Sequence, residues 1–208
     1  MNCMRKEEFI AESNIDIIKK IMEFNNGYIT TKELKNFDIS RNYISIMQDK
    51  NLIEKVARGI YIDKNKIEDV YYVLNLIAPK IIYSHMTALY FHNLSIKAPE
   101  DSFDVTVTKK YNNRKLKKHN TFYVDDMVYD VGLIMLDTPQ GNKVKAYDME
   151  RCICDIIRSK KRMDMEHIKH AVREYIKRKD KDLIKLSKYA DTFGIKEEVM
   201  DFVSMMYE

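Results

Sequence analysis

The 208-residue sequence has no tryptophan and contains few glycines, prolines and cysteines (5, 3 and 3 residues). So little glycine and proline argues against collagen-like and low-complexity chains. The three cysteines are Cys3, Cys152 and Cys154. Their number is odd and they do not form the two pairs of a zinc site, so we expect free, buried thiols. No apolar run has the length of a membrane span, and the first residues lack the apolar run of a signal peptide. We therefore expect a cytoplasmic protein that does not contact the membrane.

Net charge is also low. The whole chain carries a formal charge of only +4, which permits contact with nucleic acid without requiring it. Residues 1–63 contain ten Lys/Arg and ten Asp/Glu, so this part sums to zero and the excess lies downstream. Because phosphate contacts supply most of the non-specific affinity for DNA, a DNA-binding domain in this part would bind weakly on its own.

Residues 28–62 nevertheless show the order of a winged helix-turn-helix: a short strand, two helices and a two-stranded hairpin. A T-x-x-E capping box that ends at Glu33 predicts a helix starting at Thr31. Ser40 can cap the next helix through its hydroxyl. The hairpin, which would be the wing, is expected to end at Ile62 after a turn that contains Gly59.

The helix after Ser40 would enter a DNA groove. With Ile44 and Met47 packed inward, its outer side carries the residue types that read base edges or grip phosphates: Arg41, Asn42, Ser45 and Gln48. Two wing residues and two lesser phosphate candidates complete the predicted DNA-binding set: Lys55, Arg58, Tyr43 and Lys32. The alternatives are a merely solvated helix face and a winged helix that binds protein.

The first domain is expected to span residues 1–65 and the second residues 66–208. In the second, alternating and β-branched runs predict strands at 103–108, 121–124, 132–136 and 143–147. Helices are expected at 68–78, from Ser84, from Asp148 to about Ser159, and at 165–177, 181–192 and 196–206. The predicted class is α+β, with a winged helix-turn-helix followed by a small, mostly antiparallel sheet surrounded by helices.

Two basic runs lie in the second domain. The first has six cations and no acid: Lys109, Lys110, Arg114, Lys115, Lys117 and Lys118. The second basic run spans residues 158–162 and contains four cations. Such runs are usually solvated surface. Here they are also the obvious source of the phosphate affinity that the neutral first domain lacks.

Polar residues that could carry chemistry gather at the junction of the last strand with a helix: Asp148, Glu150, Arg151 and Asp155. A helix cap, an acid at the positive helix end and an Arg–Asp pair at i,i+4 spacing explain them structurally. No Gly-rich phosphate loop, H-E-x-x-H or G-x-S-x-G motif is present. We expect no catalytic residue, metal or cofactor, and we assign His85 and His92 to packing or capping.

The order of these motifs resembles the AbiEi family of antitoxins from type IV toxin–antitoxin, or abortive-infection, systems. The matching segments are R-G-I-Y-I at the wing, Y-S-H-M-T-A-L-Y-F-H-N-L (83–94), D-V-T-V (104–107) and Y-D-M-E-R-C-I-C-D-I-I-R (147–158). Asn93 departs from the glycine that relatives tend to carry.

The resemblance implies a transcriptional repressor that binds inverted repeats in double-stranded DNA upstream of its own operon. It also implies an antitoxin that counters a nucleotidyltransferase toxin, either through direct binding or without it. The alternative is a nuclease or toxin-modifying enzyme whose site is the motif around Glu150 and whose winged helix serves for targeting.

Overall fold

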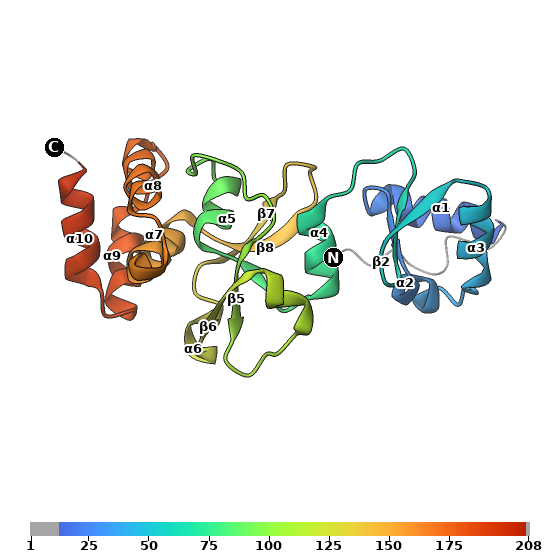
Figure 1. The fold of residues 1–208 in the computed structure, drawn as a ribbon, viewed down its shortest axis with the longest axis horizontal. Coiled ribbons are helices and arrows are strands. Elements are labelled where there is room, and N and C mark those ends of the chain that lie inside the picture. The colour runs from blue at the N-terminus through green and yellow to red at the C-terminus, as the bar shows by residue number, and fades with distance from the viewer. Residues whose placement is uncertain (1–12, 207–208) are drawn as a thin grey trace. The chain divides into compact units, whose positions relative to one another are not determined.

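A computed structural model describes residues 13–206 (Figure 1). Contacts between residues divide the chain into two compact units, residues 1–73 and 74–208, and the division falls within helix α4 (Val70–Ile77). Cys3 lies outside the described residues, whereas Cys152 and Cys154 are free and buried, as predicted. No described helix is both long and apolar enough to cross a membrane.

The first unit has the predicted order of a winged helix-turn-helix. Its helices are α1 (Asn14–Phe24), α2 (Thr31–Asn36) and α3 (Asn42–Asp49). Its strands are β1 (Tyr28–Thr30), β2 (Ile53–Ala57) and β3 (Ile60–Asp63). The central strand β3 pairs antiparallel with both of the others, so the hairpin of the wing and the first strand form one sheet.

Local sequence determines where α2 begins. The Thr30 hydroxyl accepts a hydrogen bond from the Glu33 N–H at 3.1 Å, and the Glu33 carboxylate accepts one from the Thr30 N–H at 2.8 Å. This reciprocal pair is the predicted capping box. Helix α3 differs from the prediction in that Arg41, not Ser40, occupies the cap position. Arg41 already has helical backbone angles, so Ser40 lies one residue before the cap position. From there its hydroxyl accepts a hydrogen bond from the Asn42 N–H at 3.3 Å.

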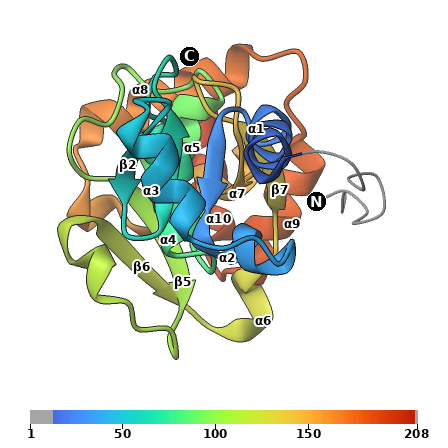
Figure 2. The same cartoon turned by 90° about the vertical axis from the view of Figure 1, so that its right-hand side faces the viewer.

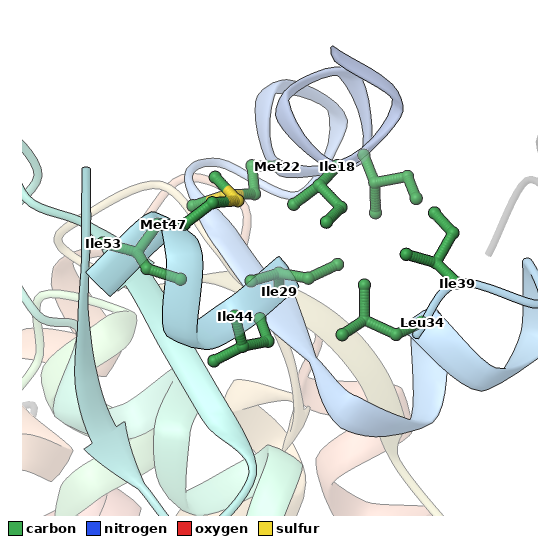
Figure 3. Close-up of a cluster of buried hydrophobic side chains, with 9 residues drawn as sticks. Ile18, Met22, Ile29, Leu34, Ile39, Ile44, Met47 and Ile53 are labelled. Carbon is green, nitrogen blue, oxygen red and sulfur yellow. The ribbon is translucent and has the colours of Figure 1, made fainter. Parts of the chain in front are cut away.

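Nine apolar side chains form the core of the first unit, and they come from every part of the predicted motif. Figure 3 shows Ile18 and Met22 of α1 opposite Leu34 of α2 and Ile44 and Met47 of α3, with Ile29, Ile39 and Ile53 closing the cluster. Each of these side chains is at most 6% exposed. Because all three helices contribute to one cluster, the orientation of α3 is fixed by packing.

The second unit contains a five-stranded sheet. Its strands are β4 (Ile82–Tyr83), β5 (Asp104–Thr108), β6 (Asn120–Val124), β7 (Leu133–Asp137) and β8 (Lys143–Tyr147), in the order β6-β5-β4-β8-β7. The α+β class is confirmed, but this sheet is mixed and not mostly antiparallel. β5 pairs parallel with β6, and β4 pairs parallel with β8. The reason is that residues 109–119 return the chain to the start of β5, while the two-residue strand β4 separates β5 from β8.

Helices accompany this sheet (Figures 1 and 2). They are α5 (His85–Phe91), the short α6 (Asp126–Tyr129), α7 (Met149–Arg158), α8 (Met165–Lys177), α9 (Leu183–Thr192) and α10 (Lys196–Met205). Helices α5 and α6 pack against β5, whereas the three tail helices pack on α7 and on one another. The three tail helices lie where the sequence predicts them. Ser84 does not cap α5 with its side chain; instead the Asp104 carboxylate accepts a hydrogen bond from the Met86 N–H at 3.0 Å.

Candidate DNA-binding surface

Helix α3 turns its polar side to solvent. Ile44 and Met47 face the core, at 4% and 1% exposure. The four residues predicted to lie outward are all exposed: Arg41, Asn42, Ser45 and Gln48. Tyr43 is half-buried because its ring packs against the core cluster. The outer face therefore carries one guanidinium, two amides and one hydroxyl, which are the groups that hydrogen-bond to base edges or phosphates.

The predicted set omits Ile46 and Asp49, which also face outward. At about 100° per residue, these two share the outermost side of α3 with Asn42 and Ser45. Ile46 is 39% exposed, and Asp49 is exposed as well. An apolar side chain at a groove surface can contact the methyl group of thymine, and a carboxylate can accept from the amino group of cytosine. Helical spacing alone was sufficient to place both residues on this face.

A close contact at Gly59 joins the wing to the start of α2. Gly59 has a φ of +74°, and a Cβ added there would lie 2.7 Å from Thr31 Oγ1. The Thr31 N–H also donates to the Gly59 carbonyl at 2.9 Å. Because Arg58 and Lys32 are chain neighbours of these two residues, the contact brings two predicted phosphate ligands to one end of the unit. Both are exposed, as is Lys55 on β2.

The first basic run of the second unit is only partly available for a ligand. Lys109 forms an ion pair with Asp125 at 2.7 Å, and Lys110 forms one with Asp126 at 3.1 Å. The other four cations lie on a short 3-10 helix, η2 (Arg114–Lys118), which Leu116 anchors in the core. These four are exposed and make no ion pair with another described residue: Arg114, Lys115, Lys117 and Lys118.

The second basic run is largely engaged within its own unit. Arg158 pairs with the buried Asp155 at 2.8 Å, and Lys160 pairs with Glu198. The guanidinium of Arg162 lies over the ring of Phe122, with its carbon 4.6 Å from the ring centroid. Among its four cations, Lys161 and Arg162 are exposed and form no ion pair within the described part of the chain. This run is therefore a weaker source of phosphate affinity than η2.

The four polar residues at the sheet-to-helix junction are buried, and Arg151 lies at their centre. Its guanidinium bonds to Asp155 at 3.0 Å and to the carbonyls of Val128 and Val131 at 2.8 Å each. It also lies against the ring of Tyr147, 4.2 Å from the centroid. Arg151 and Asp155 are 0% exposed. This arrangement ties helix α6 and the loop before β7 to helix α7.

The two remaining acids of the junction connect α7 to helices α8 and α9. Asp148 caps α7 by accepting from the Arg151 N–H at 2.9 Å. Glu150 accepts from the Tyr175 hydroxyl at 3.1 Å, and it pairs with Lys185 at 2.8 Å. These contacts occupy the oxygen atoms that a catalytic carboxylate would need to present to a substrate. The geometry is that of a structural hub.

The two histidines singled out in the sequence also serve packing. His85 is 1% exposed, bonds to Ser84 and Ser159, and stacks on Phe122 with 3.5 Å between ring centroids. Burial, together with nearby arginines, holds its pKa well below the ordinary value. His92 is the C-terminal cap residue of α5, and its Nε2 lies 2.9 Å from the Tyr147 carbonyl oxygen.

The fold and the exposed face of α3 place the first unit in the winged helix-turn-helix class of DNA-binding regulators. Residues 16–62, which run from α1 to β3, match the family model described as "Transcriptional regulator, AbiEi antitoxin". The resemblance to that family is thereby confirmed over the winged unit.

Among solved structures, the chain is similar to that of the RV2827C protein from Mycobacterium tuberculosis. The two share 10% sequence identity and a TM-score of 0.54, over 90% of this chain and 79% of the other. At this level of identity the likeness shows a shared fold. No curated protein matches the chain.

Proposed function

We propose that the protein is a DNA-binding antitoxin of a type IV toxin–antitoxin system and represses its own operon. The observation that carries this proposal is the outer face of α3, where Arg41, Asn42, Ser45 and Gln48 are exposed on a helix fixed by its core. The family match over residues 16–62 supports a transcriptional regulator. Repression of its own operon and phage defence rest on the resemblance to AbiEi antitoxins. The protein would act in the cytoplasm.

In this proposal, specificity and affinity come from different parts of the chain. The residues of α3 read base edges in the major groove, while the wing cations Lys55 and Arg58, with Lys32, grip the flanking backbone. Since residues 1–63 carry no net charge, these few contacts give little non-specific affinity. The exposed cations of η2 in the second unit supply the remainder.

The second unit would also counter the toxin, a nucleotidyltransferase, with or without binding it directly. The hub around Arg151 keeps this unit folded and takes no part in catalysis. The burial of Arg151 and Asp155 supports this structural role, because at 0% exposure neither side chain is accessible to a substrate. A nucleotidyltransferase gene immediately downstream, whose expression this protein renders harmless, would support the proposal. Growth arrest that persists when both proteins are made would count against it.

Binding to duplexes that tile the promoter of the protein's own gene tests the DNA-binding function. Fluorescence anisotropy at physiological salt should find one duplex bound much more tightly than a shuffled duplex of the same composition. If Arg41 reads a base, Arg41→Ala should weaken the binding free energy by about 1–3 kcal/mol. This loss should be confined to duplexes that keep the base pair in question. A loss that is uniform across sequences would make Arg41 a phosphate contact.

Lys188→Ala provides the matched control, since Lys188 is an exposed cation of α9 far along the chain from α3. It should leave affinity and sequence preference unchanged. Equal affinity of the wild-type protein for the promoter and the shuffled duplex, at every salt concentration tested, would refute sequence-specific repression. The solvated or protein-binding interpretation of the α3 face would then be correct.

A further inference from the structure

The second unit contains a cavity of about 280 Å³ to which the proposed DNA-binding role gives no function. It opens between the start of α5, the starts of β5 and β6, and the segment that leads into α8. Ligand sites in proteins commonly have volumes of about 300–1,000 Å³. This cavity lies just below that range, so it suits a small metabolite and is too small for a peptide or a nucleotide.

One lining residue of the cavity, Asp104, is a buried carboxylate that forms no ion pair with a described residue. Asp104 is 7% exposed, and its two oxygens accept hydrogen bonds from the Met86 N–H at 3.0 Å and the Asn120 amide at 2.9 Å. Among the described residues, no nitrogen of a basic side chain lies within 4 Å of it. A carboxylate has about four acceptor positions, so Asp104 can still accept from a ligand. Burial raises the pKa of this carboxyl, while its two hydrogen bonds and the positive charge of Arg162 act in the opposite direction.

A guanidinium lines the same cavity. The guanidinium of Arg162 lies over the ring of Phe122, which itself stacks on the buried His85. This stacking orients Arg162, and no carboxylate of the described chain lies within 4 Å of its nitrogens. Asp104 and Arg162 therefore line one cavity without forming an ion pair with each other. Asp104 accepts from Asn120, and Arg162 lies over Phe122, two residues further along β6.

The remaining lining residues fit a ligand with both charges. Lys97 and His167 also line the cavity and can add to the positive side. Asp164 also lines the cavity; it is exposed, and one of its oxygens caps α8 by accepting from the Glu166 N–H at 2.8 Å. The apolar part of the lining includes the side chains of Met86, Pro99 and Met163.

We propose that this cavity binds a small zwitterion of the free amino-acid type, with its ammonium group on Asp104 and its carboxylate on Arg162. The ammonium supplies the cation that Asp104 lacks, and the carboxylate can form a bidentate pair with the oriented guanidinium. The apolar wall accepts the ligand's side chain. A ligand with only one charge would leave the opposite group unpaired.

The test uses the full-length wild-type protein and the twenty common amino acids as probes. Ligand-observed NMR should identify at least one that binds, and isothermal titration calorimetry should then give its Kd. The N-acetyl derivative of that amino acid lacks the ammonium, and its carboxamide lacks the carboxylate. Each derivative should bind roughly 10- to 100-fold more weakly, since each loses one charged hydrogen-bonding partner.

A variant then assigns the carboxylate to Arg162. Arg162→Gln should weaken binding of the parent amino acid to the level of the carboxamide, and it should leave carboxamide binding unchanged. Arg173→Gln is the matched control, because Arg173 is exposed on α8 and does not line the cavity. Both residues are exposed, so the variants should fold normally.

Three results would overturn the proposal. One is the absence of binding by any of the twenty amino acids with a Kd below about 10 mM. A second is equal binding of the parent amino acid, its N-acetyl derivative and its carboxamide, which would show a contact that depends on neither charge. The third is unchanged binding in Arg162→Gln, which would place the ligand elsewhere.

Discussion

Replacing the four exposed cations of η2 by glutamine should reduce the salt dependence of operator binding. The variant is Arg114→Gln/Lys115→Gln/Lys117→Gln/Lys118→Gln. It keeps Leu116, which anchors η2 in the core, and Asn113, whose side chain accepts from the Lys115 N–H at 3.0 Å. The folded structure of the loop should therefore persist, and the change removes only charge.

The expected magnitude follows from counterion release. Each phosphate contact contributes about 0.9 to the slope of log Kobs against log salt concentration, so four contacts contribute about 3.6 per protomer. Between 50 and 200 mM salt, a slope difference of this size corresponds to a difference of about 150-fold in affinity. That figure is an upper bound, reached if all four side chains contact phosphate.

Anisotropy titrations of the promoter duplex at four salt concentrations give both slopes. Lys109→Gln/Lys110→Gln serves as the comparison, because these lysines already pair with Asp125 and Asp126. It should reduce the slope by less than the η2 variant does. If the η2 variant and the wild-type protein show the same slope, η2 does not contact DNA, and the proposed source of affinity is wrong.

Three further predictions concern stability. Gly59→Ala should lower the free energy of unfolding by at least about 1–2 kcal/mol, since Gly59 has a left-handed conformation and lies close to Thr31. Urea unfolding measures this free energy. Glu150→Ala should lower the melting temperature, because Lys185 and the Tyr175 hydroxyl lose their partner, and antitoxin activity should fall in parallel. Burial raises the pKa of Asp104 above 3.8, so the folded protein binds that proton more tightly than the unfolded chain. The contribution of Asp104 to the free energy of unfolding should therefore fall as pH rises above about 4, and Asp104→Asn should remove this contribution from the pH dependence.

Each of these predictions has a contradicting outcome. Unchanged unfolding of Gly59→Ala would mean that the wing adopts another conformation. Loss of antitoxin activity in Glu150→Ala at an unchanged melting temperature would make Glu150 part of a functional site instead of the hub. The same pH slope in Asp104→Asn and the wild-type protein would show that the Asp104 carboxyl has an ordinary pKa.

Residues close together in the sequence accounted for most of the winged unit. The T-x-x-E box places the start of α2, and the period of Ile44 and Met47 orients α3, because both depend on interactions within one or two helical turns. The same spacing would have placed Ile46 and Asp49 on the outer face. Residue type did not indicate them, because an apolar and an acidic side chain are less typical of contact with DNA than amides, hydroxyls and cations.

In the second unit, the local patterns predicted the tail helices and the capping role of Asp148, but not how the sheet is assembled. The strand β4 has two residues, too few to show a period, yet it lies between β5 and β8 and makes the sheet mixed. The cap of α5 likewise cannot be predicted from neighbouring residues, because the carboxylate that accepts from the Met86 N–H belongs to Asp104, 18 residues away.

The sequence by itself determined the winged helix-turn-helix, the zero charge of residues 1–63 and the resemblance to AbiEi antitoxins, since each depends on residue order and type. Only the tertiary structure decided which cations remain unpaired. Lys109 and Lys110 meet Asp125 and Asp126 across neighbouring strands, whereas η2 meets no acid in the described chain. Tertiary packing also placed Asp104 and Arg162 on the lining of one cavity without pairing them, because contacts with distant segments fix each side chain separately.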